Sequence, residues 1–343
     1  MLLAHNPARR VHESEYEGRV GKQGIGGPTD GVGAVTPDGG RLVTNRDGVP
    51  LSFNRAPADD VAPWLSRMVG AKIWAAPDAR VECAMCNDTA YVRSVIGGNW
   101  TATTADGRGA YLDESLVFGP HSKAMPLTCT GPVYTAGFGL RPGALYQLWA
   151  IRAETLVDRI ASSDIIGLKQ EEFAGFFRAE DTPEHWLDLL EELMREQIRT
   201  VDPDPPDPVT TAFDHAAFED PNLCIADFAE IHGVGIRQLE RRIKRDFGHT
   251  PKQVLRRARA LDFAAQLLNV ADDAEEEEVL LRYSDQSHAI REFTTFFGIT
   301  PHRFRSVPHP LMIVTLETRQ ARRMEELKRI EAGGKRPWLA EGI

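Results

Sequence analysis

The sequence has few cysteines and no long hydrophobic run. Four cysteines in a chain of 343 residues are too few for a disulfide framework, which favours a reducing compartment. They are Cys83, Cys86, Cys129 and Cys224. The longest apolar stretch, residues 311–316, is far shorter than the roughly 18–20 residues of a membrane helix. Since the N-terminus also lacks the basic flank and apolar core of a secretion signal, we expect a cytoplasmic protein with no membrane partner.

The chain also lacks a net positive charge, because its formal net charge is −10 at pH 7. A total says little about nucleic-acid binding, however, since the field near a surface depends on where the charges lie. Here the signs are segregated. Between Arg237 and Arg259, nine lysines and arginines stand against only Glu240 and Asp246. The negative total therefore does not exclude DNA as a partner of this segment.

An internal repeat is present in the C-terminal part. The sequence Phe247-Gly248 followed by Thr250-Pro251 recurs as Phe297-Gly298 followed by Thr300-Pro301. Each glycine can take the left-handed conformation that ends a helix. Each threonine and proline then supply an N-cap and a first helical residue. Both copies therefore predict a helix that ends at the glycine and a second helix that starts at the proline.

The first copy has the full layout of a helix-turn-helix unit. A leading helix over 225–232 precedes a turn at Gly233, and the second helix begins near Ile236. The residues expected in the core of this unit are Ile225, Phe228, Ala229, Ile231, Ile236, Leu239, Ile243 and Phe247. This apolar stripe fixes the second helix against the first and leaves the opposite, cationic face free to meet a partner.

The free face carries side chains that suit DNA. Arginine can bind guanine through two hydrogen bonds and glutamine can read adenine, while flanking cations contact phosphate. On this helix we expect Arg237, Gln238 and Arg241 to reach bases. The phosphate-contact candidates are Arg242, Lys244, Arg245, Thr250, Lys252, Arg256, Arg257 and Thr300. The connecting helix, residues 252–268, is about 25 Å long, so it could place two recognition helices near one DNA turn apart, about 34 Å.

Residues 222–306 resemble the paired helix-turn-helix domain of AraC/XylS-type transcription regulators. The most specific stretch is Tyr283-Ser284-Asp285-Gln286-Ser287-His288, followed by Phe293, Phe297-Gly298 and Thr300-Pro301. The resemblance implies base contacts from exposed positions early in each recognition helix. In this sequence these positions are Arg237, Glu240 and Arg241 in the first unit, and Gln286, Ser287, His288 and Arg291 in the second.

The second unit departs from the family pattern in two places. Arg282 stands where the family usually has glycine, and the acidic run 272–278 precedes it. Those acids fit either a longer loop between the units or a second unit that packs poorly. We therefore expect the first unit to be the main DNA reader.

The expected fold class is α+β, a β-rich N-terminal domain with helices followed by an all-α domain of two helix-turn-helix units. Residues 1–60, rich in glycine and proline, predict a loosely structured arm. Residues 61–200 predict a β-rich sensor or dimerisation domain that ends in helices. The prolines of residues 201–211 predict a linker. A double helix-turn-helix domain over 212–306 and a C-terminal helical tail over 307–343 complete the chain.

The N-terminal part resembles, in residues 118–125 and 137–143, the sensor half of one subset of these regulators. That half is β-rich, and it receives a signal or supports dimerisation. Candidate partners of the chain are therefore double-stranded DNA, RNA polymerase, a small-molecule effector and a second copy of the chain. The sequence predicts no cofactor and no enzymatic activity, because no paired nucleophile and base and no complete set of metal ligands is apparent.

Three local features allow two interpretations each. Cys83 and Cys86 could form half of a zinc site completed by Cys129 and His121, but a β-rich core explains such small residues better. The stripe Leu187, Leu190, Met194 and Ile198 is either a dimer seam or, as we favour, a helix packed on its own domain. The charged tail helix, residues 319–330, is expected to be solvated, with phosphate contacts as the alternative.

Two other functions compete with the regulator. One is an enzyme in residues 60–200 fused to a DNA-binding module, which a bound zinc held by the cysteines would support. The other is a protein-interaction adaptor with a degenerate DNA module, suggested by the acidic run 272–278.

Overall fold

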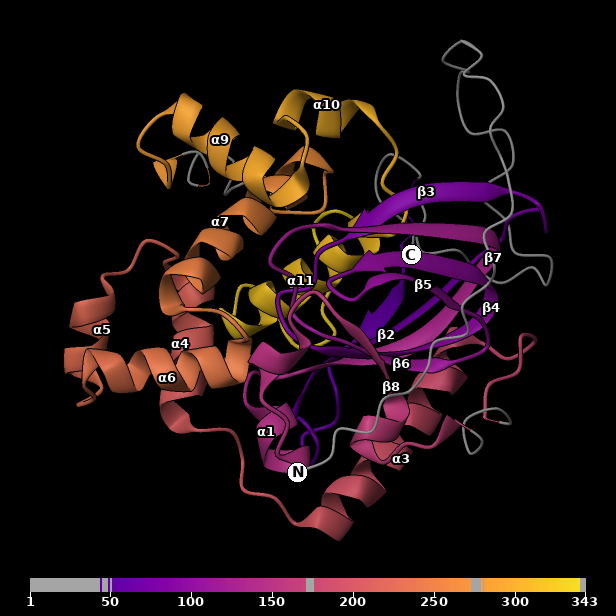
Figure 1. Ribbon diagram of the computed structural model, residues 1–343, viewed down its shortest axis with the longest axis horizontal. Coiled ribbons are helices and arrows are strands. Elements are labelled where there is room, and N and C mark those ends of the chain that lie inside the picture. Colours follow the sequence, from indigo (N-terminus) through magenta and orange to yellow (C-terminus); the bar gives the residue numbers. More distant parts are fainter. Residues whose placement is uncertain are drawn as a thin grey trace.

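A computed structural model describes residues 44, 49, 51–170, 176–272, 279 and 281–339. It shows an N-terminal antiparallel sheet with helices packed on it and a helical C-terminal part, which confirms the α+β class (Figure 1). Most of the predicted arm, residues 1–43, 45–48 and 50, lies outside the described residues. Its predicted end at residue 60 is wrong, because Leu51 and Ser52 are buried and the first strand follows at once.

Eight antiparallel strands form one sheet in the order β1-β2-β7-β4-β6-β8, with β3 paired to β7 and β5 paired to β4. The strands are β1 (Phe53–Arg55), β2 (Leu65–Ile73), β3 (Arg80–Met85), β4 (Tyr91–Thr104), β5 (Gly107–Tyr111), β6 (Ser115–Phe118), β7 (Met125–Leu140) and β8 (Ile160–Ser162). The central strands β4 and β7 are long, and β7 pairs with β3 through its first half and with β2 through its second half.

The β4–β7 pairing shifts its register around Gly97, where the two long strands bend. Next to it, Gly98 has φ +79°, and a Cβ there would lie 2.2 Å from the carbonyl oxygen of Pro132. Only glycine fits this close approach without strain. Gly97-Gly98 in β4 and Gly131-Pro132 in β7 therefore lie at an irregularity within two long strands.

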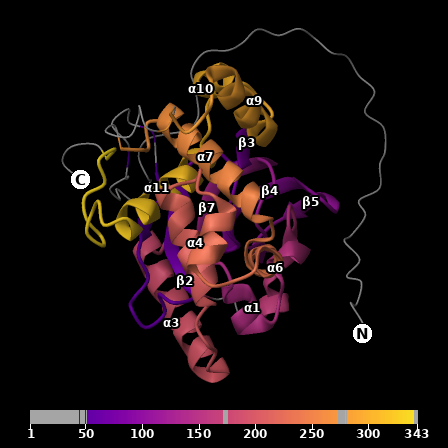
Figure 2. The same cartoon turned by 90° about the vertical axis from the view of Figure 1, so that its left-hand side faces the viewer.

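Helices and short 3-10 turns occupy the rest of the described chain. The N-terminal part has α1 (Ala144–Trp149), η1 (Ala153–Leu156), η2 (Ser163–Ile166) and α3 (Pro183–Val201). The C-terminal part has α4 (Pro208–Glu219), α5 (Ile225–Ile231), α6 (Ile236–Phe247), α7 (Pro251–Leu267), α9 (Gln286–Phe297), α10 (Pro301–Ser306) and α11 (Met312–Glu326). Helices α6 and α9 lie toward opposite ends of α7 (Figures 1 and 2).

The irregular segment between α3 and α4 is shorter than the predicted linker of residues 201–211. Helix α3 ends at Val201, and Asp202 caps it in the left-handed conformation. Helix α4 already starts at Pro208, where the Asp207 carboxylate accepts a hydrogen bond from the amide of Val209. A proline in the first helical position lacks only a donor that would have no partner there, so the last proline starts a helix rather than interrupting one.

Helix α3 covers one face of the sheet through its apolar stripe. Leu187, Leu190, Met194 and Ile198 are all buried in a core shared with β2, β4, β6, β7 and α1. The stripe is therefore the inner face of a helix packed on its own domain, and the dimer-seam interpretation is wrong.

Helix α11 packs against β2, β3 and α7, and nearly all of its residues are buried. Its apolar side belongs to a core that the sheet shares with α7, α9 and α10. The expectation of a solvated tail helix is therefore wrong, and phosphate contacts from Arg322 and Arg323 are excluded by their burial. The physical reason is that carboxylates from several elements surround the arginines of α11.

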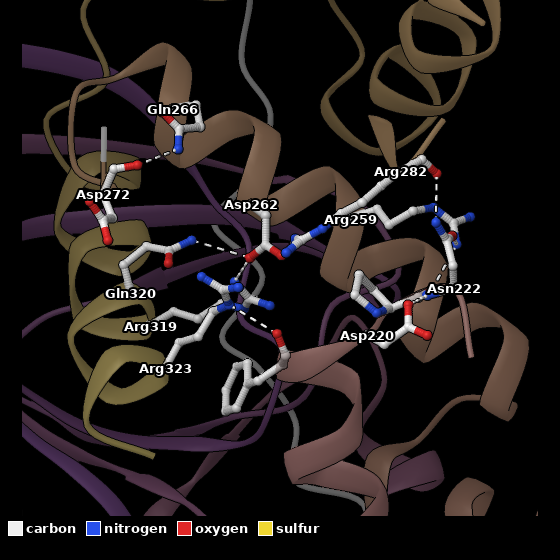
Figure 3. Close-up of polar contacts among 12 residues, drawn as sticks. Asp220, Asn222, Arg259, Asp262, Gln266, Asp272, Arg282, Arg319, Gln320 and Arg323 are labelled. Atoms are coloured by element: carbon white, nitrogen blue, oxygen red, sulfur yellow. Dashed lines mark hydrogen bonds and ion pairs between the residues drawn. The ribbon is translucent and has the colours of Figure 1, made fainter. Parts of the chain in front are cut away.

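These buried ion pairs join the sheet domain to the C-terminal helices. Asp262 on α7 accepts hydrogen bonds from Arg282, Arg319 and Gln320 (Figure 3). Three further pairs cross the junction, Arg141–Glu326, Arg67–Glu325 and Arg319–Asp88, and three lie within the C-terminal part, Arg322–Asp214, Arg322–Glu326 and Arg336–Glu317. Burial alone would raise the pKa of Asp262, but the charges of the arginines around it hold that pKa at about 2.

Replacing Asp262 with alanine should lower the free energy of unfolding by about 3–5 kcal/mol, because it leaves buried guanidinium groups without their carboxylate. The measurement is urea denaturation of the full chain. Asp188→Ala is the matched control, since Asp188 is 71% exposed in its pair with Arg55 and should cost less than about 1 kcal/mol. Equal losses in the two variants would contradict a structural role for the network.

Candidate nucleic-acid interface

The first helix-turn-helix unit is built from α5 and α6, as the repeat predicts. Gly233 forms the turn with φ +63°, and Gly248 ends α6 in the left-handed conformation with φ +76°. Thr250 caps α7 and Pro251 is its first residue. Helix α4 completes the core, with the Phe213 ring centroid 5.2 Å from that of Phe228. These local predictions are confirmed.

Two residues expected in this core are exposed instead. Ile231 is 79% exposed and Ile236 is 50% exposed, whereas Phe228, Leu239 and Ile243 are buried. The core is enclosed by α4, α6 and α7, and the two isoleucines flank the turn at Gly233 outside it. The 3.6-residue pattern alone could not show where the neighbouring helices end.

The beginning of α6 is open to solvent. Its candidate base-contact residues Arg237, Gln238, Glu240 and Arg241 are all exposed. They extend from a helix that is fixed by buried Leu239, and so a duplex could reach them without unfolding the unit. Their contact with bases stays a prediction.

The end of α6 lies against the N-terminal domain. Lys244 Nζ is 3.4 Å from a Glu154 carboxylate oxygen on η1, and Arg242 is 3.4 Å from Asp207. The guanidinium of Arg245 lies 4.4 Å from the ring centroid of Tyr146 on α1 and pairs with Asp246. Three of the predicted phosphate contacts are therefore held by other partners in this arrangement.

A groove of about 450 Å³ lies between α6 and the segment that contains α1 and Arg152. It is lined by Tyr146, Arg152, Asp207, Gln238, Arg241, Arg242 and Arg245. Three of its four arginines pair with carboxylates, Arg152 with Glu154, Arg242 with Asp207 and Arg245 with Asp246. The groove is continuous with the exposed start of α6, where Arg241 lies.

The other phosphate candidates differ widely in accessibility. Arg257 is only 2% exposed and donates to the backbone carbonyls of His121 and Asp88, so its prediction as a phosphate contact is wrong. Arg256 forms an ion pair with buried Glu292 at 2.8 Å, whereas Lys252 is exposed. The periodicity of α7 did not reveal that Arg257 lies on the side of the helix that faces the sheet domain.

The side chains of Thr250 and Thr300 act as helix caps. Their hydroxyl oxygens accept hydrogen bonds from the amides of Gln253 and Arg303. Thr250 is half-buried and Thr300 is exposed, so contact of either with phosphate stays a prediction.

The second unit places its recognition helix, α9, in the same way. Gly298 ends α9 with φ +72°, and Thr300 caps α10. The N-cap of α9, which the sequence prediction did not include, is Asp285, whose carboxylate accepts from the amide of His288 at 2.7 Å. An aspartate directly before a helix is a common N-cap, so the residue type was the available signal.

The base-contact candidates of α9 are accessible to different degrees. Gln286, Ser287 and Arg291 are exposed, while His288 is half-buried, with Nδ1 3.2 Å from the Ser284 hydroxyl. Arg282, in the position where the family usually has glycine, forms an ion pair with Asp262. Most of the acidic run, residues 273–278, lies outside the described residues.

The cysteines do not form a metal site in the described part of the chain. Cys86 and Cys129 are buried, Cys83 is half-buried, and no group of three or more histidine, cysteine or acidic side chains could hold a metal ion there. Burial raises the pKa of the Cys86 thiol to about 12. These positions agree with the interpretation of small residues in a β-rich core. Among the described helices, none is long and apolar enough to span a membrane.

Two buried histidines lie where the sheet domain meets α7. Burial lowers the pKa of His121 to about 4, and burial, aided by the nearby charge of Arg257, lowers the pKa of His249 to about 3. Both imidazoles are therefore neutral at pH 7, while in the unfolded chain they titrate near 6.5.

Stability should therefore fall on acidification. Between about pH 6.5 and pH 4 the unfolded chain binds two protons that the folded chain excludes, which lowers the free energy of unfolding by up to about 2.7 kcal/mol per pH unit. Urea denaturation at several pH values measures this slope. Replacing His121 and His249 with glutamine should flatten it, and replacing exposed His185 should not. A slope unchanged in the double variant would contradict the assignment.

Comparison with known proteins gives one family match and several distant structures. Residues 206–306 match the family model described as Helix-turn-helix domain. No curated protein sequence matches the chain. The chain is similar to ToxT from Vibrio cholerae, with 8% identity and a TM-score of 0.41 over 70% of this chain and 98% of that one.

Two further structures are similar at the same distant level. ToxT with bound unsaturated fatty acid, from Vibrio cholerae strain SCE256, shows 7% identity and a TM-score of 0.39 over 75% of this chain and 96% of that one. The AraC-like transcriptional activator CuxR shows 13% identity and a TM-score of 0.26 over 75% and 92%. At such low scores, only the family match bears on function.

Proposed function

We propose that α6 is the main DNA reader of this chain, which is a DNA-binding transcription regulator with an AraC-type helix-turn-helix domain at residues 206–306. The observation that carries the proposal is the exposure of the first half of α6 on a helix whose opposite side is buried. In this class of unit the start of the recognition helix enters the major groove and meets base edges. Arg237, Gln238, Glu240 and Arg241 are in that position.

Phosphate contacts come from the cations that flank these residues. Lys252 is exposed at the start of α7, and Arg241 and Arg242 line the groove beside α6. Helix α9 offers Gln286, Ser287 and Arg291 to a second stretch of the same duplex. Each neutralised phosphate releases counterions, so DNA affinity should fall steeply as the salt concentration rises.

The N-terminal domain regulates this reader through the contact between η1, α1 and the end of α6. Glu154 and Tyr146 hold Lys244 and Arg245, two cations that a duplex would also attract. A signal that moves η1 away from α6 would therefore release positive charge toward DNA. An effector of the sheet domain, a second copy of the chain and RNA polymerase are the further partners that we propose. The protein is proposed to act in the cytoplasm, where it meets the DNA.

Replacing Arg241 with alanine should cost roughly 1–3 kcal/mol of binding free energy at one base position and relax specificity there. Bound sites are first selected from random duplexes, and affinities are then compared across single-base variants of the best site. Arg199→Ala on α3 is the control, since Arg199 is a 63% exposed arginine outside the interface. A site preference unchanged by Arg241→Ala would exclude this residue as a base reader.

Replacing Glu154 with glutamine should raise DNA affinity several-fold at low salt, because it frees Lys244 and Arg152, both of which pair with this carboxylate, for phosphate. The plot of log affinity against log salt concentration should steepen by about 0.9 for each phosphate contact that is added. Glu184→Gln, an equal charge change at an exposed position of α3, controls for net charge. Unchanged affinity and slope in Glu154→Gln would show that this carboxylate does not compete with DNA.

A further inference from the structure

A cavity of about 140 Å³ lies where the sheet domain meets both helix-turn-helix units. It is bordered by the β6–β7 connection, the turn between α6 and α7, α7 itself and α9. His121, His249, Arg256 and Arg257 are among the side chains on its wall. Its volume is well above the roughly 10–15 Å³ that one water molecule needs, so it can hold a small ion of several atoms.

Two buried nitrogen atoms on this wall have no hydrogen-bond partner among the described residues. They are Nε2 of His121 and Nε2 of His249. His121 is fully buried and His249 is 6% exposed, so bulk water does not supply the missing bonds. The other ring nitrogen of His121, Nδ1, lies 3.2 Å from the amide nitrogen of Asn87 and 3.1 Å from the carbonyl oxygen of Met85. In the tautomer in which Nδ1 accepts from the Asn87 amide, Nε2 of the neutral imidazole carries the proton and can donate it to a ligand.

The wall of the cavity has an excess of positive charge. Arg257 is buried, and its hydrogen bonds in the structure go to two backbone carbonyls, those of His121 and Asp88. The Asp88 carboxylate itself pairs with Arg319. Arg256 adds a second guanidinium, paired with Glu292, and no acidic residue lines the cavity. A buried guanidinium without a direct carboxylate partner favours an anion beside it.

We propose that this cavity binds a small oxyanion, either phosphate or a short-chain carboxylate. Ring donors from His121 and His249 meet its oxygens, and Arg256 and Arg257 balance its charge. The ion then bridges the sheet domain to α7 and α9, so its presence sets how the two recognition helices are held against the sensor. This regulatory consequence rests on the proposed function, whereas ion binding itself does not.

The test uses the full chain without DNA. Calorimetric titrations with inorganic phosphate, sulfate, acetate and succinate are compared with chloride at equal ionic strength. We expect saturable binding at one site by phosphate or by one of the carboxylates. The ion that binds more tightly shows whether the site takes phosphate or a carboxylate. His249→Gln should weaken binding about tenfold or more through loss of a charge-assisted hydrogen bond. Exposed His185→Gln should leave it unchanged.

A measurement on the unsubstituted chain keeps the proposal testable if a histidine variant does not fold. In ¹⁵N spectra of the imidazole rings, the Nε2 signals of His121 and His249 should shift on titration with the bound ion, while those of His185 stay in place. Binding no stronger than that of chloride, or ring signals that do not move, would overturn the proposal. The Arg241→Ala variant should still bind the ion, so a failure of DNA recognition and a failure of this site can be told apart.

Discussion

Ion pairs buried around α11 hold the sheet domain and the helix-turn-helix domain in one arrangement. Arg67 and Arg141 from the sheet domain reach Glu325 and Glu326 on this helix, and Asp262 from α7 accepts from its Arg319. Removing such charges from water is costly unless each meets its partner, so the geometry of the junction is strongly specified. Domains separated by a short proline-rich segment would otherwise be expected to move independently.

The same arrangement divides α6 into two halves with different surroundings. Its first half extends from the protein with exposed polar side chains, and its second half lies against α1 and η1. Rigid attachment fixes the direction of the reading surface, and the carboxylates of Glu154 and Asp207 reduce its positive charge. In the proposed function, DNA affinity can change when a few ion pairs move, because the residues proposed to read DNA are already exposed.

The sequence predicted best those features that depend on neighbouring residues alone. The left-handed glycines Gly248 and Gly298 and the cap at Thr250 follow from local backbone chemistry, and the structure shows all three. The inner stripe of α3 was correctly favoured for the same reason, because its period was clear. The helix start at Pro208, by contrast, was placed inside the predicted linker, because proline is common both in linkers and at the first position of a helix.

Features set by distant contacts could not be predicted. Arg319, Arg322 and Arg257 look like solvated cations in the sequence, and their carboxylate or carbonyl partners come from segments far along the chain. One signal was available: the apolar run of residues 311–316 at the start of α11 is hydrophobic on every side, which is typical of a buried helix. No such signal indicated that His121 and His249 line the same cavity.

The contacts of α11 also determine the order in which the parts of the molecule can form. The pair between Arg67 and Glu325 closes a loop of 258 positions, whereas the core around Phe213 and Ile243 joins residues near in sequence. Long loops cost more chain entropy to close, and such contacts form late. During folding the first helix-turn-helix unit can therefore be complete while the junction is still open. For that interval Lys244 at the end of α6 would lack its counter-charge from Glu154 on η1, and this helix would carry more uncompensated positive charge than in the folded protein.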